Sequence, residues 1–450
     1  MHELLNDAAA RAIRYLDGLE ARRVTPAPEA LTALKELEGP LPEEPTDPVA
    51  VLALLDNVGS PATVATAGPR FFGYVIGGSL PVTLAANWLA AAWDQPAFAY
   101  GVSPIAATLE EIALRWLLDL FGLSPICSGA FVTGATMANF CCLAAARHDV
   151  LNNVGWDVEA DGLSGAPPVS VIVGAEAHPS LFKALGMVGF GRQRVVTVPV
   201  DSQGRMRPDA FPVISGPAIV CLQAGNVNSG AFDPARELIP RAHEAGAWVH
   251  VDGAFGLWAS ASPACAHLMS GYADADSWAT DAHKWLNVPY DSGLAFVRDP
   301  EALRAAMATS AAYLPPPSER RDPAQFTPEA SRRGRGIEIW AALCSLGRAG
   351  LADLIERTCR HTQRFAEGLC AAGYQVLNEV VINQVLVSFG DGERTRRAVG
   401  AIQREGTCWC GPTVWQGQPA MRISISSWAA TEADVEHSLA AIVRIAREQA

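Results

Sequence analysis

The sequence predicts an α/β protein with a mainly parallel sheet covered by helices, followed by a smaller α+β region. Short apolar runs alternate with stretches of helical period, which is typical of parallel strands joined by crossover helices. The chain has 450 residues, more than one core usually supports, so two domains are expected. A proline-rich stretch, YLPPPSERRDP, indicates a boundary after about residue 310.

The first 67 residues are expected to form a helical arm. Residues 1–23 contain early acidic residues and are typical of an amphipathic helix rather than a signal peptide. The apolar stripe of this helix consists of Leu5, Ala8, Ala12, Leu16 and Leu19. We therefore expect an arm over residues 1–67, a large domain over 68–310, and a loop with a small C-terminal domain over 311–450.

Five β-rich runs and four helical stretches make up most of the predicted large domain. The runs lie at residues 169–176, 194–200, 218–225, 247–254 and 293–299. The helical stretches lie at residues 102–123, 135–151, 180–189 and 234–246. Residues 153–168 lack periodicity and are expected to form a loop, whereas SWATDAH (277–283) is a further candidate strand. In an open sheet of this kind, ligands bind beyond the carboxyl ends of the strands.

The composition argues against some partners. A formal net charge of −13 argues against a nucleic-acid-binding surface and against docking on an anionic membrane. The sequence has no run of about eighteen uninterrupted apolar residues, so no membrane-spanning helix is expected. With no export signal recognised, the ten cysteines are expected to be reduced and the protein cytoplasmic.

Polar residues follow the predicted strands at the ends where a ligand would bind. His178 follows the first run, Asn226 follows the third, and Asp252 ends the segment WVHVD. The candidate strand SWATDAH leads directly to Lys284. Because the carboxyl ends of parallel strands share one edge of a sheet, these four side chains could converge there.

Upstream of these runs, VTGATMANF (132–140) places small residues at an expected helix N-terminus. Gly134, Ala135 and Thr136 would let backbone amides approach an anion, which the helix dipole favours. The segment lacks the GxxxxGK[ST] spacing of a nucleotide-binding loop, so a single phosphate group is the favoured ligand. Alone, the same pattern is also produced by an ordinary tight turn.

A phosphate cradle, an aspartate, a histidine and a lysine are together what pyridoxal 5′-phosphate (PLP) requires. The lysine forms a Schiff base, the aspartate pairs with the pyridine nitrogen, and the imidazole can lie on the ring. Each residue alone has an ordinary explanation: a turn or cap for Asp252, a structural histidine for His178, a surface charge for Lys284. Their joint occurrence in chain order favours one site over four coincidences.

Several motifs resemble the group II PLP-dependent amino-acid decarboxylases, which include aromatic-L-amino-acid and glutamate decarboxylases. GPRFFGY (68–74) is similar to the family segment HPxFFxY, and SPIAATLEEIALRWL (103–117) is similar to SPAxTELExxVxxWL. HVDGAFG (250–256) is similar to HVDAAxG, and DAHKWLNVPYDSG (281–293) to the lysine motif. The resemblance covers about residues 65–435 and implies fold type I, the aspartate aminotransferase fold, with a seven-stranded type of sheet.

The resemblance also assigns roles to residues upstream of the lysine. TGATMAN (133–139) is similar to the phosphate-binding segment, which implies that Ala135 and Thr136 hold the phosphate. Asn139 would support the start of the helix, and Asn226 would face the cofactor site. His178, in AEAHPSLFKA, would stack on the cofactor ring.

The remaining cofactor contacts come from the two later motifs. Asp252 would partner the pyridine nitrogen, and Ala254 would provide a packing surface under the ring. Lys284 would carry the cofactor, and His283 would flank the phosphate. Tyr313, in SAAYLPP (310–316), is similar to the loop tyrosine that protonates the carbanion after decarboxylation.

The resemblance implies decarboxylation of an L-amino acid to an amine and carbon dioxide through a quinonoid intermediate. Two segments depart from the family pattern and leave the identity of the substrate open. They are VIGG after FFGY, and AGNVNSGAFD in place of TxGTTxxGAFD. Tyr74, Phe98 and Tyr100 could line the pocket, so an aromatic or otherwise apolar substrate is preferred.

The fold type also implies a homodimer. Two alternatives to decarboxylation remain for the function. One is a PLP-dependent carbon–carbon lyase or aldolase, or an aldehyde-forming oxidative decarboxylase. Phosphosphingosine lyases resemble this chain around the lysine and aspartate, but their membrane anchor and basic cluster are not seen here. The remote alternative is a catalytically idle binding protein, which intact Lys284, Asp252, His178 and Tyr313 disfavour.

Overall fold

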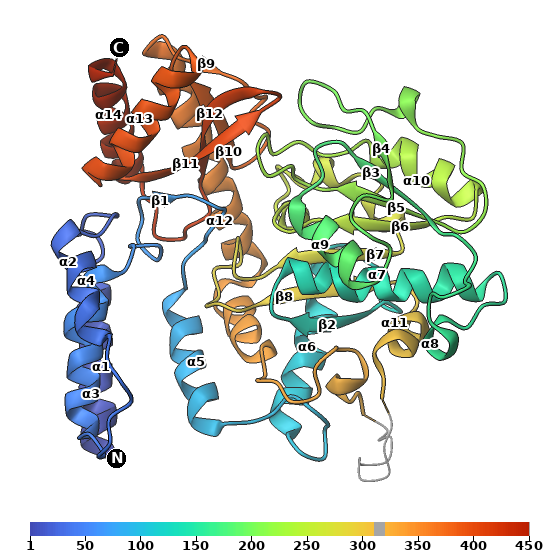
Figure 1. Ribbon diagram of the computed structural model, residues 1–450, viewed down its shortest axis with the longest axis horizontal. Helices are drawn as coiled ribbons and strands as arrows, with labels where there is room; N and C mark the ends of the chain where they lie inside the picture. Colours follow the sequence, from blue (N-terminus) through green and yellow to red (C-terminus); the bar gives the residue numbers. More distant parts are fainter. Residues whose placement is uncertain (310–319, 450) are drawn as a thin grey trace. The chain divides into compact units, whose positions relative to one another are not determined.

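The computed structural model describes residues 1–309 and 320–449, which form two compact units. One unit comprises Met1–Gly78, His361–Leu377 and Val385–Ala450. The other comprises Ser79–Arg360 and Asn378–Gln384. Both are seen in Figure 1. These units are defined by contacts between residues, and the domain boundaries expected from the sequence stay a prediction.

The larger unit is built on a seven-stranded sheet with the order β2-β8-β7-β6-β5-β3-β4. The strands are β2 (Ser128–Val132), β3 (Ser170–Gly174), β4 (Val195–Val198), β5 (Ala218–Gln223), β6 (Trp248–Asp252), β7 (Ser277–Asp281) and β8 (Gly293–Val297). Strand β8 runs antiparallel to both β2 and β7, and the other pairs are parallel. The predicted mainly parallel sheet is therefore confirmed.

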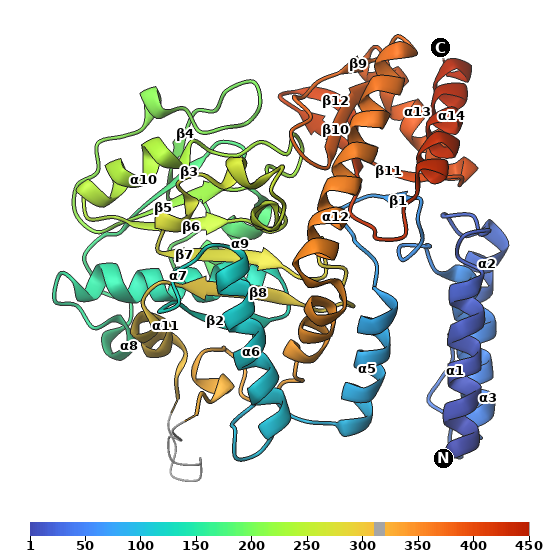
Figure 2. The same cartoon turned by 180° about the vertical axis from the view of Figure 1, so that it is seen from behind.

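Helices cover both faces of this sheet, which explains the continuous apolar character of its central strands. The helices of this unit begin with α5 (Pro81–Trp93), α6 (Pro104–Leu120), α7 (Ala135–Asn152), α8 (Val158–Asp161) and α9 (Pro179–Met187). They continue with α10 (Ala235–Glu244), α11 (Pro300–Met307) and the start of α12 (Gly336–Ala371). Helix α7 packs across β6, β7 and β8, whereas α6 lies on the opposite face (Figures 1 and 2).

Several elements of this unit were not predicted from the sequence. Strand β2 and helices α5 and α11 were not expected, and α8 lies inside the stretch predicted to be a loop. That prediction is wrong at α8 because Asp157 caps the helix, accepting hydrogen bonds from the amides of Glu159 and Ala160 at 3.1 Å. One short turn of helix carries too few residues to show a periodic pattern.

The smaller unit combines the N-terminal arm with a five-stranded sheet of order β1-β11-β12-β10-β9. Its strands are β1 (Phe71–Phe72), β9 (Gln375–Val376), β10 (Gln384–Ser388), β11 (Trp409–Trp415) and β12 (Gln418–Ser424). Its helices are α1 (His2–Asp17), α2 (Pro28–Ala33), α3 (Pro48–Leu54), α4 (Ser60–Ala62), α13 (Gly392–Glu405) and α14 (Glu432–Glu448), with the end of α12. The parallel pair β1–β11 connects residues near the start and end of the chain.

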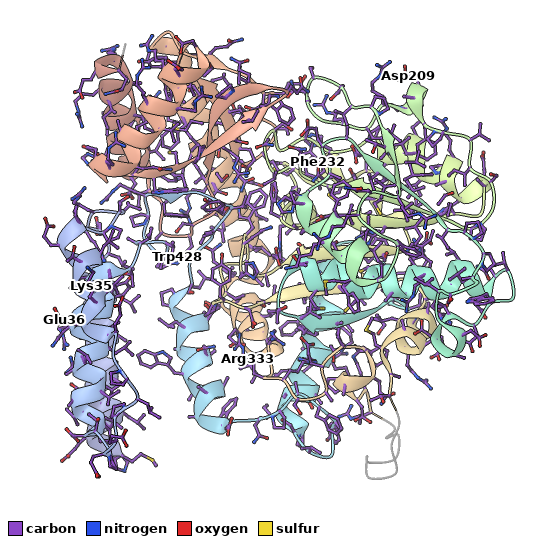
Figure 3. The ribbon with its side chains drawn as sticks, viewed as in Figure 1. Lys35, Glu36, Asp209, Phe232, Arg333 and Trp428 are labelled. Carbon is purple, nitrogen blue, oxygen red and sulfur yellow. The ribbon has the colours of Figure 1, made fainter. Side chains whose placement is uncertain are left out.

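The expected N-terminal helix is present as α1, but none of its residues is buried in the described chain. Leu5 and Leu16 of the apolar stripe are exposed, as are Lys35 and Glu36 on the short helix that follows α2 (Figure 3). Among the described residues, no helix is long and apolar enough to span a membrane.

A buried ion pair joins α6 to the segment before α12. Glu110 and Arg332 have side chains that are each 2% exposed, and they form two hydrogen bonds of 2.6 and 2.8 Å. We expect Arg332→Met to lower the free energy of unfolding by about 3–5 kcal/mol because Glu110 would be left as an unpaired buried charge. Urea denaturation measures the effect.

Two further variants test the cause of that loss. Glu110→Leu combined with Arg332→Met removes both charges and is expected to recover part of the stability. Arg444→Met, which breaks surface pairs with Glu448 and Glu405, is expected to cost at most about 1 kcal/mol. Equal losses for Arg332→Met and Arg444→Met would contradict the assignment of the penalty to burial.

Candidate active site

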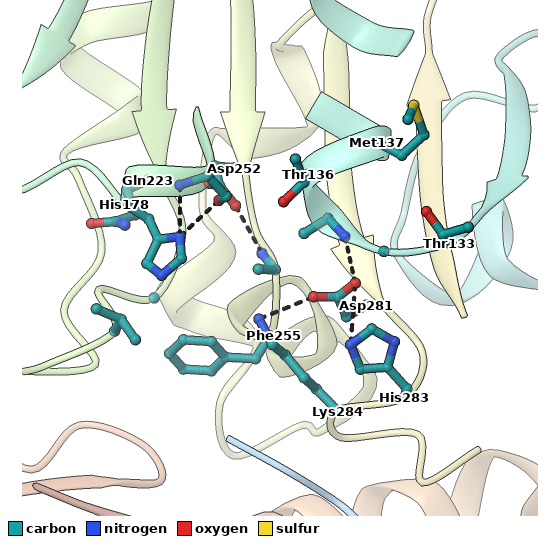
Figure 4. Close-up of a pocket in the computed structure, with 16 residues that line it drawn as sticks. Thr133, Thr136, Met137, His178, Gln223, Asp252, Phe255, Asp281, His283 and Lys284 are labelled. Atoms are coloured by element: carbon teal, nitrogen blue, oxygen red, sulfur yellow. Dashed lines mark hydrogen bonds and ion pairs between the residues drawn. The ribbon is translucent and has the colours of Figure 1, made fainter. Parts of the chain in front are cut away.

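One cavity of the larger unit lies at the carboxyl ends of the central parallel strands. It has a volume of about 350 Å³ and is lined by residues that follow β2, β3, β5, β6 and β7 (Figure 4). This is the position where open α/β sheets bind ligands. The cavity wall includes the side chains of His178, Asp252, His283 and Lys284, together with the start of α7.

The start of α7 is held against the start of β8 by two glycines. A Cβ atom on Gly293 would lie 2.4 Å from the Cα of Gly134, so this approach requires glycine at position 293. A Cβ atom on Gly134 would point toward Asp281 and His283, at 3.4 Å from each. Ala135 and Thr136 follow and line the cavity. The helix therefore presents its N-terminal amides to the cavity with little side-chain bulk between them and a ligand.

Asp252 ends β6 and is oriented by a chain of hydrogen bonds. Its Oδ2 accepts from Asn139 Nδ2 at 3.2 Å, and its Oδ1 accepts from the Ala254 amide at 3.3 Å. Asn139 Oδ1 pairs with His250 Nε2 at 2.9 Å, and His250 Nδ1 pairs with Ser277 Oγ at 3.0 Å. Burial lowers the pKa of His250 to about 3, so the imidazole is neutral and donates through Nε2. This chain of hydrogen bonds orients the Asp252 carboxylate through residues that do not line the cavity.

Lys284 reaches into the cavity from the turn after β7. Its side chain is 18% exposed, and Nζ lies 3.0 Å from Asp281 Oδ2 and 5.9 Å from the ring centroid of Phe255. Figure 4 shows the lysine, Phe255 and Asp281 facing one another. A lysine amine held in a partly buried cavity is a suitable nucleophile for a carbonyl group.

His283 stands beside Lys284 with a defined tautomer. Its Nδ1 accepts from the Ser292 amide at 3.2 Å, so the neutral ring carries its proton on Nε2. Burial lowers the pKa of His283, and this outweighs the raising effect of Asp281. The ring of Tyr290 lies against the imidazole at a centroid distance of 4.4 Å. His283 thus presents an N–H donor toward Asp281, whose Oδ1 is 3.6 Å away.

His178 lies on the opposite wall, at the N-terminus of α9. Its Nδ1 accepts from the Ser180 amide at 3.2 Å and pairs with the Ser180 hydroxyl at 2.7 Å, which fixes the ring. Gln223, the last residue of β5, also lines the cavity.

The structure brings most of the predicted site residues together, with three exceptions. Asn226 does not line the cavity, because its Oδ1 accepts from the amides of Asn228 and Ser229 and its Nδ2 donates to Gln223. Asn139 lies behind Asp252 rather than on the wall. Tyr313 lies outside the described residues.

Of the wall residues that were not predicted from the sequence, two had a signal in their position. Asp281 ends β7 and Gln223 ends β5, so both occupy the strand-end position that identified Asp252. Asp281 also stands three residues before Lys284, a spacing that allows an ion pair across a turn.

Comparisons with known proteins identify the family. The model of the pyridoxal-dependent decarboxylase conserved domain matches residues 28–390. An aromatic-L-amino-acid decarboxylase of Bacillus atrophaeus is 27% identical over 370 residues, which cover 79% of this chain and 74% of that protein. An L-2,4-diaminobutyrate decarboxylase of Rhizobium meliloti is 29% identical over 435 residues, covering 91% and 84%. The chain belongs to the pyridoxal-dependent decarboxylase family.

Other relatives agree on the family but differ in length. The acidic amino acid decarboxylase GADL1 of Mus musculus is 30% identical over 308 residues, which cover 66% of this chain and 55% of that protein. The chain likewise covers 63% of the bovine and 64% of the human GADL1 proteins. The chain therefore spans between about half and two thirds of the length of these relatives. The predicted family is confirmed.

Solved structures confirm the predicted fold type. Oryza sativa TDC, solved with PLP and tryptamine, superposes with a TM-score of 0.91 at 23% identity and covers 99% of this chain and 97% of that chain. Mouse CSAD superposes with a TM-score of 0.90 at 22% identity, covering 99% and 98%.

The cavity residues fit PLP, the cofactor that the family implies. The donor set offers an amine on Lys284 for an aldehyde and a carboxylate on Asp252 for a protonated ring nitrogen. The helix N-terminus after Gly134 offers amides for a phosphate, and glycine there keeps the cradle open. PLP is therefore the cofactor of this family member.

Proposed function

We propose that this protein is a PLP-dependent L-amino-acid decarboxylase that releases carbon dioxide and the corresponding amine. The observation that carries the proposal is the convergence of Lys284, Asp252, His178 and the α7 N-terminus on one cavity. These residues lie within the segment that matches the pyridoxal-dependent decarboxylase family. When bound, PLP supplies an electron sink for the pair released from the bond to the substrate carboxylate.

Each wall residue has a part in this proposal. Lys284 would bind the cofactor covalently, and Asp252 would hold a proton on the pyridine nitrogen. The amides of Ala135 and Thr136 would bind the phosphate. His283, which carries its proton on Nε2, supplies a further donor beside the phosphate site.

The opposite wall would support the ring of the cofactor. His178 would lie on one face, because its ring is held by Ser180 on the cavity wall. Ala254 would leave room for the ring on the other side. Asn139 would act through Asp252 by donating to its carboxylate, and Asn226 would act through Gln223 by orienting its amide.

The substrate class is a finer proposal. Relatives named for aromatic, acidic and diaminobutyrate substrates all match this chain at 27–30% identity. We propose an aromatic or otherwise apolar amino acid, because the sequence offers no dedicated cluster for a second carboxylate. Tyr74, Phe98 and Tyr100, which were expected to line the pocket, are not on the wall of the described cavity.

The proposal is tested by measuring carbon dioxide release from a panel of L-amino acids with purified, PLP-loaded protein. The panel contains tryptophan, tyrosine, glutamate, cysteine sulfinate and 2,4-diaminobutyrate, and products are identified by mass spectrometry. Equal amounts of carbon dioxide and amine support the proposal, and the preferred substrate names the class. Aldehyde without carbon dioxide would assign carbon–carbon cleavage instead, and no turnover of any amino acid by PLP-loaded protein would favour an idle binding protein.

Replacing Tyr313 tests the fate of the reacting carbon. Tyr313→Phe removes the proposed acid, so we expect a shift from amine toward aldehyde, carbon dioxide and ammonia, with dioxygen as the two-electron oxidant and hydrogen peroxide as its product. The aldehyde fraction is measured by mass spectrometry under air. Amine as the sole product of Tyr313→Phe would contradict a role for Tyr313 in protonation.

Two properties of the whole protein belong to the same proposal. We propose a homodimer, because the apolar residues Leu5 and Leu16 of α1 are exposed in the single chain. Light scattering at micromolar concentration measures the mass. We also propose a cytoplasmic location, which cell fractionation tests.

A further inference from the structure

Asp281 places a buried negative charge at the point where the cofactor anion is expected. The residue is 3% exposed, and its Oδ1 accepts from the Ala135 amide at 2.6 Å. Its Oδ2 lies 3.0 Å from Lys284 Nζ, and His283 Nε2 lies 3.6 Å from Oδ1. Figure 4 shows the helix amide, the imidazole and the lysine converging on this carboxylate.

The backbone of Asp281 is fixed on both sides. Its amide donates to the Ala254 carbonyl at 2.9 Å, and its carbonyl accepts from Trp258 Nε1 at 3.0 Å. Asp281 is also the last residue of β7, where its side chain is directed at the α7 N-terminus. The carboxylate can therefore change partners by side-chain rotation but cannot withdraw with the main chain.

The groups that Asp281 holds are the groups that the cofactor needs. The proposed function assigns the Ala135 amide to the phosphate and Lys284 to the aldehyde. A carboxylate and a phosphate at one helix N-terminus compete for the same donors and repel each other. Lys284 Nζ also has to leave its 3.0 Å contact with Asp281 Oδ2 before it can bond to an aldehyde.

We propose that Asp281 is an internal anion that occupies the cofactor cradle in the cofactor-free protein and weakens retention of PLP. The proposal rests on the proposed function, since it takes the same cavity as the PLP site. It makes Asp281 a positioning residue whose charge stabilises the empty site and opposes the loaded one. Removal of the charge should then strengthen cofactor binding, although the residue lies within the cofactor site.

The variant Asp281→Asn tests this by keeping an acceptor for the Ala135 amide while removing the charge. We expect the variant to bind PLP about tenfold tighter, the effect of removing one unit of unfavourable charge interaction at close range. The dissociation constant is measured by titrating the cofactor-free protein and following the absorbance of bound PLP. The cofactor-free variant should also melt at a lower temperature, because Lys284 loses its partner.

Inorganic phosphate provides a readout that needs neither turnover nor the lysine. Phosphate should raise the melting temperature of cofactor-free Asp281→Asn more than that of the wild-type protein. The control is Asp276→Asn. Asp276 directly precedes β7, at the opposite end of the strand from Asp281. Its carboxylate accepts from the Val249 amide at 2.7 Å and pairs with His243 at 2.9 Å. That variant should change neither PLP nor phosphate affinity.

Weaker or unchanged binding of PLP and phosphate by Asp281→Asn would overturn the proposal. If that variant does not fold, Asp281→Ser offers a neutral acceptor on a smaller side chain, and the same gain is expected. The outcome separates this proposal from the proposed function. If phosphate stabilises Asp281→Asn more than the wild-type protein but neither protein binds PLP, the internal anion is supported and the PLP assignment is rejected. If the wild-type protein binds PLP and neither Asp281→Asn nor Asp281→Ser binds PLP or phosphate more tightly, the PLP assignment is supported and the internal anion is rejected.

Discussion

Replacing Lys284 by methionine is expected to lower kcat for carbon dioxide release by about 10⁴-fold or more, a loss typical of removing a covalent nucleophile. Methionine retains most of the side-chain volume but has no amine to bond to the cofactor. The variant should also lose PLP during gel filtration, because only non-covalent contacts would remain. Single-turnover carbon dioxide release and the absorbance of bound PLP measure the two effects.

The chain offers a matched control because it contains only three lysines, Lys35, Lys183 and Lys284. Lys183 lies on α9, the helix that begins beside His178, and its side chain is exposed. Lys183→Met should retain wild-type kcat and bound PLP. Comparable losses in Lys183→Met and Lys284→Met, or persistent covalent PLP in Lys284→Met, would contradict the assignment of Lys284.

Asp252→Asn is expected to produce the second largest loss, about 10²- to 10³-fold in kcat, the scale found when one preorganised electrostatic contact is removed. The neutral amide can no longer hold a proton on the pyridine nitrogen, so the ring becomes a weaker electron sink. The change should appear in kcat more than in KM, because the carboxylate acts on charge that develops during the reaction. Steady-state rates with the preferred amino acid measure the split.

Two variants show whether the loss belongs to the Asp252 charge. Asn139→Ala removes the amide that donates to Asp252 Oδ2 and should lower kcat less than Asp252→Asn, because the charge remains. Asp233→Asn changes another buried carboxylate, which accepts from the amides of Met206 and Gln223 at 2.7 Å. It should lower stability and leave kcat per cofactor-loaded molecule unchanged. An equal loss in Asp233→Asn would mean that Asp252→Asn acts through folding.

The sequence predicted the parts of the fold that depend on continuous local patterns. Strands β3, β5 and β6 are apolar on both faces, so they stood out as runs, and the helices between them show a clear period. Strand β2, SGAFV, begins with small residues and was not recognised. It is stabilised by its antiparallel pairing with β8, a contact across more than a hundred and fifty residues that no local pattern encodes.

The candidate site was predictable to the extent that position in the chain determines position in space. Asp252 and Lys284 could be placed because each follows a strand of one sheet. Asn226 could not, because its amide turns back to hold the loop after β5, and residue type alone does not show which way a side chain points. Asp281 was missed because its importance comes from the start of α7, which the topology brings to it.

The most direct test of the central claim is to locate the cofactor on the chain. PLP-loaded protein is reduced with borohydride and digested, and the lysine-containing peptides are identified by mass spectrometry. With three lysines in the sequence, the result is unambiguous. The account predicts that the pyridoxyl group is found on the peptide containing Lys284 and that the peptides with Lys35 and Lys183 are unmodified. Cofactor on either of those lysines, or on none, would contradict the assignment of this cavity as the active site.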